Sequence, residues 1–493
     1  GQGHRGVRLV RPPRELDIRT DLGEPAVLAI VTSLWGEGPA GFEWEVTRDD
    51  HMEHAGWERC LDVPALFHNG PHVAGVIIDD LLIRTRGGRE AATALVASLN
   101  EQAARLGGKP LVVTFDLHTF GGMSISRSPC KRVITTSMPH YIEGVAAAWL
   151  PGYLETGHLA AGVPKGKELR ARLSNLKADQ GEGPLSKMQR ELLSLAQVLR
   201  WMTMRVARIM RHVHCLSRVA HRAPTDAMPC ALGTLALAID SRREGRSYGL
   251  AAEAAHCDGV LKGTMHDGKR ATIHVADEAK LSSGAPGDME GWSDVNWGIV
   301  DDGRVVPEDG TYALVGSDVT CADVMALAVT INGGAVLIEL KMTGSFAPSS
   351  AEQEALAMLK LSHKLVYLRT VAARCGKVQL RPSMLLCDAA ASLRVAAGEI
   401  SAARLRHALR QTAIITQRVR ADEVTLAHVP DACQVVDFLT KWVSPAKEEA
   451  SLAYLCNFAA RAAVEQGASE ASAAVAMLVR LASVYACWSA ESA

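Results

Sequence analysis

Apolar and polar positions divide the chain into short β-branched runs and longer stretches with helical periodicity. Between residues 25 and 150, three runs have the composition of strands: "PAVLAIVTSLW", "HVAGVIIDDLLI" and "KPLVVTFDLHTF". A helical pattern, "REAATALVASLNEQAARLGG", separates the second run from the third. Strand, helix and strand in succession predict a parallel βαβ unit, and therefore an α/β domain in residues 25–150.

The two following segments differ sharply in composition. Residues 151–184 are rich in Pro and Gly, which is typical of a linker. Residues 185–224 carry apolar side chains three and four positions apart, which predicts one long helix or a bent pair ended by Pro224. The apolar stripe consists of Leu192, Leu195, Leu199, Met202, Val206 and Ile209.

Further along the chain, Asp-Gly pairs between short apolar runs predict hairpin turns. The stretch "GSDVTCADVMALAVTINGGAVLIELKM" follows at residues 316–342. It predicts a strand ending at Asp318, which caps a helix beginning near Cys321. A reversal at Gly333-Gly334 then leads into a strand that ends at Lys341.

These patterns together predict an α+β, mostly helical, multi-domain protein. It has an N-terminal α/β layer, a central β-rich region and a helical C-terminal third. The central β-rich and α/β domain is expected in residues 225–348. Residues 349–493 are Ala-rich and predict a helical domain.

The first 24 residues predict an extended basic arm, because Pro12-Pro13 forbids a helix and favours a polyproline conformation. Such an arm would lie on a neighbouring protein surface. The alternative is contact with RNA phosphates through Arg5, Arg8, Arg11 and Arg14.

Composition narrows the class of protein. A chain of 493 residues is too long to fold around a single hydrophobic core of ordinary size. Its 53 Lys and Arg residues nearly balance its 54 Asp and Glu residues, so the net charge is close to zero. No apolar run is long enough for a membrane span, and the N-terminus has no secretory signal. The eleven cysteines form no C-x-x-C pair, which predicts reduced thiols in an intracellular protein.

Two kinds of residue cluster have metal-binding or catalytic character. "HMEH" (His51 and His54) and "HVHC" (His212, His214 and Cys215) are rich in metal ligands, although buried or surface histidines without a metal are the alternative. "FDLHTFGG" places Asp116 and His118 at a strand end. A metal-dependent hydrolase using His51, His54, Asp116 and His118 is therefore one hypothesis.

Arginine-rich helical stretches at residues 200–222 and 403–420 favour pairing with carboxylates across protein–protein interfaces. Contact with RNA phosphates and a plain solvated surface are the alternatives.

The stretch at residues 311–342 resembles the second half of the methyltransferase-like domain of viral RNA-capping enzymes. The resemblance would make Asp318 and Lys341 catalytic residues. Upstream, "GAPGDMEGWS" resembles the glycine-rich turn of those enzymes, so that Gly284 and Gly287 would approach S-adenosylmethionine. An RNA methyltransferase, active or degenerate, using residues 284–342 is therefore the alternative function.

In overall style the chain resembles capsid or turret-like surface proteins of double-stranded RNA viruses. The arm, the Ala-rich helical mass and the lack of a strong catalytic motif carry this resemblance. It implies a structural subunit of a large RNA-associated assembly, without a catalytic residue, cofactor or metal. The expected partners are copies of the same chain or other subunits of the assembly. The expected location is the virion or the host cytoplasm.

Overall fold

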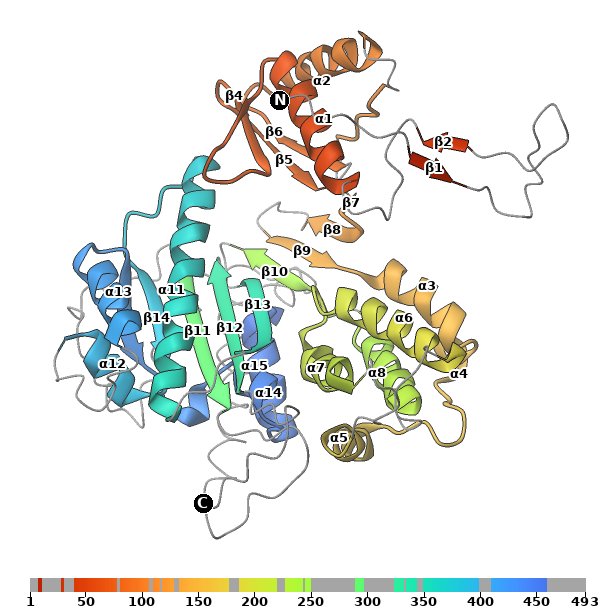
Figure 1. Cartoon of the computed structure of the whole chain (residues 1–493), viewed down its shortest axis with the longest axis vertical. Coiled ribbons are helices and arrows are strands. Elements are labelled where there is room, and N and C mark those ends of the chain that lie inside the picture. Colours follow the sequence, from red (N-terminus) through yellow and green to blue (C-terminus); the bar gives the residue numbers. More distant parts are fainter. Residues whose placement is uncertain are drawn as a thin grey trace, which may run out of the picture. The chain divides into compact units, whose positions relative to one another are not determined.

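The computed structural model divides the protein into two compact units, residues 1–116 and residues 117–493, which are described separately. The elements are shown in Figure 1. The structure describes residues 8–10, 28–30, 40–77, 80–105, 110–115, 118–127, 133–176, 186–219, 227–242, 244–249, 289–296, 323–331, 334–343, 349–398 and 409–458. In this part of the chain the fold is α+β, with helices predominating over several sheets, as the sequence predicts.

The first unit contains an antiparallel sheet packed with two helices, α1 (Ala40–His54) and α2 (Gly88–Arg105). Its strands are β3 (Glu58–Arg59), β4 (Leu66–Asn69), β5 (His72–Ile77) and β6 (Asp80–Arg84). The predicted parallel βαβ unit is wrong, because residues 110–115 after α2 form no strand and β5 and β6 pair with each other as an antiparallel hairpin. A two-residue connection allows such a hairpin, whereas a parallel pair needs a long crossover.

The arm predicted for residues 1–24 is described only at β1 (Arg8–Val10), which pairs antiparallel with β2 (Leu28–Ile30). Arg5, Arg11 and Arg14 lie outside the described residues.

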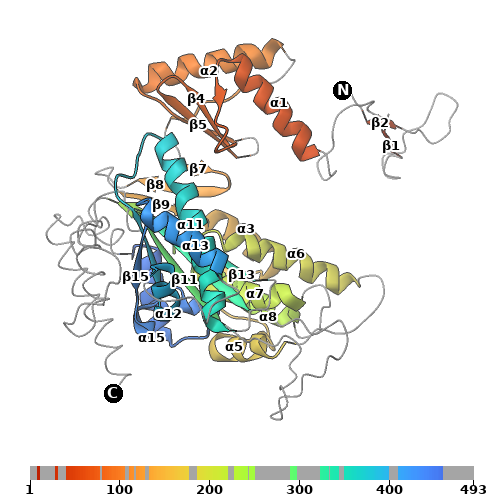
Figure 2. The same cartoon turned by 60° about the vertical axis from the view of Figure 1, so that its left-hand side comes forward.

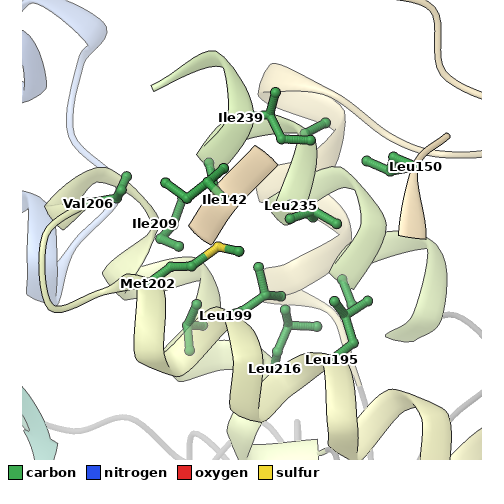
Figure 3. Close-up of a cluster of buried hydrophobic side chains, with 14 of the residues drawn as sticks. Ile142, Leu150, Leu195, Leu199, Met202, Val206, Ile209, Leu216, Leu235 and Ile239 are labelled. Carbon is green, nitrogen blue, oxygen red and sulfur yellow. The ribbon is translucent and has the colours of Figure 1, made fainter. Parts of the chain in front are cut away.

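The second unit begins with a helical half built around the predicted apolar stripe. All six stripe residues are buried, and the helix is interrupted after Met202, so the predicted bent pair is confirmed. Figure 3 shows Leu195, Leu199, Met202, Val206 and Ile209 of this stripe in one cluster with Ile142, Leu216 and Leu235. The helices are α3 (Pro139–Trp149), α4 (Tyr153–Thr156), α5 (Gly166–Ser174), α6 (Lys187–Met202), η2 (Ala207–Ile209), α7 (Met210–Val219) and α8 (Ala227–Asp240).

Two predictions for this half are wrong. Residues 151–184 are not simply a linker, since α5 buries Leu169 and Leu173 in the helical core. Helix α8 occupies the start of the region predicted to hold short strands and turns. The Gly and Pro residues around α5 predicted a loop, and α5 was therefore not recognised as a helix. Helix α8 is buried on nearly all sides, so its sequence lacks the amphipathic pattern that identifies a helix.

A small antiparallel sheet adjoins this half, in the order β10-β9-β8-β7. The strands are β7 (Thr119–Phe120), β8 (Met123–Arg127), β9 (Val133–Ser137) and β10 (Arg246–Gly249).

The other half of the second unit is a five-stranded sheet in the order β13-β12-β11-β14-β15. Three consecutive strands, β11 (Met289–Asn296), β12 (Val324–Ile331) and β13 (Gly334–Met342), form an antiparallel meander. Strands β14 (Ser383–Cys387) and β15 (Val424–His428) extend the sheet in parallel with β11. The described part of the predicted helical domain at residues 349–493 therefore also supplies two strands of this sheet.

The helix predicted from about Cys321 is wrong. Residues 324–331 form β12, which pairs with β13 as a hairpin. Seven of the eight β12 residues are buried, because helices cover both faces of the sheet. A strand buried on both faces lacks alternation and reads as a continuous apolar run, which sequence patterns do not distinguish from a buried helix.

Helices cover the two faces of the sheet (Figure 2). One face packs against α11 (Ser350–Arg374), α12 (Ala390–Ala396) and α13 (Leu409–Arg420). The other face packs against α14 (Asp437–Thr440), α15 (Pro445–Leu455) and the start of α7. Among the described helices, none has the length and apolar character needed to cross a bilayer.

Substitution of two helical glycines, Gly233 in α8 and Gly144 in α3, tests how closely α8 packs against the segment before α5. A Cβ on Gly233 would lie 2.4 Å from the carbonyl oxygen of Pro164, whereas one on Gly144 in α3 would meet nothing within 4 Å. We expect Gly144→Ala to stabilise the protein by about 0.5–1 kcal/mol, since alanine is the better helix former. Gly233→Ala should destabilise it by about 1–3 kcal/mol through overpacking. Urea unfolding of the two variants checks this, and equal stabilisation by both would contradict the close approach.

Candidate active site

Four acidic side chains from separate elements converge at one edge of the five-stranded sheet. They are Asp294 in β11, Glu354 in α11, Asp388 directly after β14 and Asp437 at the start of α14. Carboxylate oxygens of Asp294, Asp388 and Asp437 lie within 4.8 Å of one another. Ligand atoms of Glu354, Cys387 and Asp388 do so as well, and Asp388 is therefore common to both groups. We call these four residues the acid cluster.

Strand direction explains why the acid cluster forms at this edge. Because β11 and β14 are parallel, their carboxyl ends lie together and bring Asp294 next to Asp388. This is the edge at which ligands commonly bind in sheets with parallel strands. Helix α11 begins after β13 reaches the same edge, so its first turns place Glu354 there, and α14 contacts β11 (Figure 1).

Each acid is held by specific contacts. Glu354 Oε1 accepts a hydrogen bond from the backbone N–H of Val295 at 3.2 Å. Asp294 accepts one from the hydroxyl of Thr440, which also donates to the carbonyl of Asp437. The carbonyl of Asp388 lies 3.0 Å from His428 Nε2, which fixes the backbone at the end of β14. The geometry of the site therefore depends on the sheet and on α14 together.

The cluster concentrates negative charge in a place that is largely closed to water. Side chains of Asp294, Glu354 and Asp437 are buried, and Asp388 is half-buried. Burial, together with the nearby Asp437, raises the pKa of Asp294 to about 7. Burial and neighbouring carboxylates also raise the pKa of Asp388 and hold that of Glu354 well above its usual range. Protons or cations must therefore neutralise the cluster.

Two lysines supply part of this neutralisation. Lys441 Nζ lies 3.1 Å from Asp437 and 3.5 Å from Asp294, and Lys447 forms an ion pair with Asp437. Among the described residues, no lysine or arginine forms an ion pair with Glu354 or Asp388. The acids of the cluster thus exceed its ammonium groups.

The donor set suits a hard divalent cation. Carboxylate oxygens are the ligands that Mg²⁺ and Mn²⁺ prefer. Cys387 is fully buried, and burial raises the pKa of its thiol well above the usual value. It lies 3.6 Å from Glu354 Oε2, to which it donates a weak hydrogen bond. The carboxylates of Asp294, Asp388 and Asp437 therefore fit a divalent cation such as Mg²⁺, and Glu354 with Asp388 would offer carboxylate ligands to a second one.

Arginines of the helical half fix the segment that carries Asp437. Arg211 donates hydrogen bonds to the carbonyls of Leu439 and Thr440, and its guanidinium lies over the ring of Trp442. Arg170 contacts the same ring from α5 and forms an ion pair with Glu448. In the Arg-rich stretch at residues 200–222, Arg208 forms ion pairs with Glu244, Glu448 and Glu449, so this arginine pairs with carboxylates of its own chain.

The histidine clusters predicted from the sequence contribute no residue to the acid cluster. His51 and His54 are at the end of α1 in the first unit, where His54 Nδ1 lies 2.7 Å from the carbonyl of Asp50. In α7, burial and nearby arginines lower the pKa of His212 to about 3 and that of His214 to about 4. Within the described residues no histidine belongs to a group of three metal ligands.

The remaining predicted site residues are placed as follows. His118 is exposed, and Asp116 lies outside the described residues, as do Asp318, Gly284 and Gly287. Lys341 is exposed at the end of β13, where its ammonium lies 3.0 Å from Glu339. The structure does not bring Lys341 into the acid cluster.

Sequence analysis missed all four acids of the cluster. They are spread over 144 residues with no local motif, and each alone reads as a helix cap or a strand end. The one available signal was "LLCDAA", in which Asp388 follows a buried apolar run, as expected for an acid at the end of a parallel strand.

Neither a comparison with protein-family models nor a search of curated proteins finds a match for this chain. The assignment of the site therefore depends on its geometry.

The raised pKa of Asp294 predicts how stability changes with pH. The folded protein holds this proton up to about pH 7, whereas the unfolded chain releases it near the ordinary value of 3.8. Stability without metal should therefore fall as pH rises from about 4 to 7. We expect Asp294→Asn to reduce this fall and to raise the melting temperature at pH 8 in EDTA. Thermal unfolding from pH 5 to pH 8 measures both, and a variant with an unchanged slope would contradict the assignment.

Proposed function

We propose that the second unit is a metal-dependent nuclease that hydrolyses phosphodiester bonds at the acid cluster. The observation that carries the proposal is the convergence of Asp294, Glu354, Asp388 and Asp437 at the carboxyl ends of parallel strands, with more carboxylates than ammonium groups. Bound there, two Mg²⁺ ions would stabilise charge on the attacking and leaving oxygens of a phosphate ester.

The side chains have distinct roles in this reaction. Asp388 would hold both ions, Asp294 and Asp437 would complete one ion site, and Glu354 would complete the other. Glu354 is also placed to take the proton of the attacking water. The water oxygen bonds to phosphorus as its proton passes to Glu354, the bond from phosphorus to the sugar oxygen breaks, and that oxygen takes up a proton from solvent.

Lys441 and Lys447 would have a different role. Their ammonium groups balance Asp294 and Asp437 in the metal-free protein and give way in part when cations bind. They also hold α14, and with it Asp437, against the sheet. These ion pairs reduce the electrostatic repulsion among the four carboxylates in the protein without bound substrate.

The topology supports the same class of protein by analogy. The sheet has three antiparallel strands, β11, β12 and β13, followed by two strands, β14 and β15, that run parallel to β11. The resulting order, β13-β12-β11-β14-β15, is the strand order of ribonuclease H-like folds. A fold alone does not define an activity, so the acid cluster carries the argument and the topology adds to it.

The functions predicted from the sequence stay predictions. A structural subunit of an RNA-associated assembly is compatible with a nuclease unit, since both contact RNA. The methyltransferase alternative loses the strand–helix–strand unit on which its resemblance depends, because β12 and β13 form a hairpin. Contacts of the N-terminal arm with RNA also stay a prediction.

Cleavage of a labelled oligonucleotide tests the proposal. We expect the purified chain to cut RNA, DNA or an RNA–DNA hybrid in Mg²⁺ or Mn²⁺, and EDTA to stop the reaction. Asp388→Asn should lower the rate by about 100-fold or more, since even changes that only touch a metal ligand cost about 10–100-fold.

Asp422→Asn is the matched control. It makes the same chemical change at an exposed turn before β15, at the opposite edge of the sheet, and asparagine tolerates the positive φ of 54° found there. This variant should keep the full rate. An Asp388→Asn protein as active as the Asp422→Asn protein would show that cleavage takes place elsewhere or comes from a contaminant.

A further inference from the structure

A separate cavity of about 220 Å³ lies between the sheet and α11. Its floor is formed by Met325 and Leu327 of β12. Its walls carry Glu339 and Lys341 from β13 and Lys360, His363 and Lys364 from α11. The four acids of the cluster are not among its lining residues. We call this cavity the lysine pocket.

The lysine pocket has an excess of positive charge. Glu339 is the one carboxylate among its lining residues, and it already binds Lys364 at 2.8 Å and Lys341 at 3.0 Å. Lys360 forms no ion pair or hydrogen bond with any residue that the structure describes. Three ammonium groups therefore face one carboxylate, and the uncompensated charge would attract an anion.

The surroundings of Lys360 and His363 also favour the binding of an anion in the lysine pocket. Burial and the charge of Lys341 lower the pKa of Lys360, and burial and Arg418 lower that of His363. Burial and the neighbouring positive charges thus disfavour the protonated forms of Lys360 and His363, and a bound anion would offset this repulsion. A polar rim over an apolar floor is also typical of a ligand site, which fixes its ligand by a few charged groups.

The strand register places the lysine pocket close to the acid cluster. Asp294 pairs with Ala326, and Ala326 pairs with Leu340, so these residues form one row across three strands. Lys341 is one residue further toward the edge that carries the acids. Lys341 pairs with Met325, so its side chain is on the face of the sheet that α11 covers and from which Glu354 enters the cluster. Two strand spacings separate its strand from β11, about 10 Å. A nucleic-acid strand bound at the acid cluster would bring a nearby phosphate of the same strand within this distance.

We infer that the lysine pocket binds a backbone phosphate of the same nucleic-acid strand that the acid cluster cleaves, a few nucleotides from the cut. Lys341 and Lys360 contact the phosphate, while Lys364 keeps its bond to Glu339. The inference deepens the proposed nuclease function and supplies a positioning contact without base specificity, since phosphates carry no sequence information.

Binding of a fluorescent single-stranded oligonucleotide in EDTA, where no cleavage occurs, tests this inference. We expect Lys341→Gln and Lys360→Gln each to weaken binding by about 5- to 10-fold and to reduce the slope of log Kd against log salt by about one. Lys187→Gln, in α6 and 86% exposed, should change neither quantity. Stabilisation of the folded protein by Mn²⁺ should be unaffected in all three variants, because none of these lysines touches the acid cluster.

The outcomes separate this inference from the proposed function. Pocket variants that bind like the wild type, in a chain that still cleaves, would overturn the pocket and leave the nuclease. Weaker binding by the pocket variants in a chain that does not cleave would support phosphate binding while refuting catalysis. If inorganic phosphate binds the pocket but does not compete with the oligonucleotide, the pocket takes a free anion and the inference is wrong.

Discussion

The parallel pairing of β11 with β14 is the constraint on which the second unit depends. It joins a meander of three strands to segments that begin almost ninety residues after the end of β11, and it leaves β11 buried between two neighbours. The pairing brings Asp294 and Asp388 to one edge, and it requires a crossover, which α11 provides. Since α11 must begin at that edge to return across the sheet, Glu354 is delivered by the same connection. The site is thus a consequence of the topology.

Placing several carboxylates in one partly dry location is unfavourable, and the fold offsets this cost by other means. The backbone N–H of Val295, the hydroxyl of Thr440 and two lysines each stabilise a negative charge. Hydrophobic packing around Trp292 on one face and Met358 on the other holds the sheet and helices in register. Preorganised carboxylates of this kind need little rearrangement when cations and substrate bind, which is the condition for electrostatic catalysis.

Local patterns were sufficient to predict some of this fold and none of the acid cluster. The stripe from Leu192 to Ile209 was predicted correctly because it faces one core and exposes its other side, which produces a helical period. Strand β12 was mistaken for a helix because both of its faces are buried. The acids come from four elements, and only the pairing of distant strands makes them neighbours. The pairing of distant strands cannot be inferred from a single sequence that contains no recognised motif.

The arginine contacts to residues 439–448 have a consequence for how the second unit is assembled. Arg170, Arg208 and Arg211 belong to the helical half, yet they bind the segment that closes the sheet half. The two halves are therefore not exchangeable modules. A sheet half separated from its helices would lose the contacts that hold α14, and with them the position of Asp437. Any recombination that separates the two halves would therefore disrupt the acid cluster.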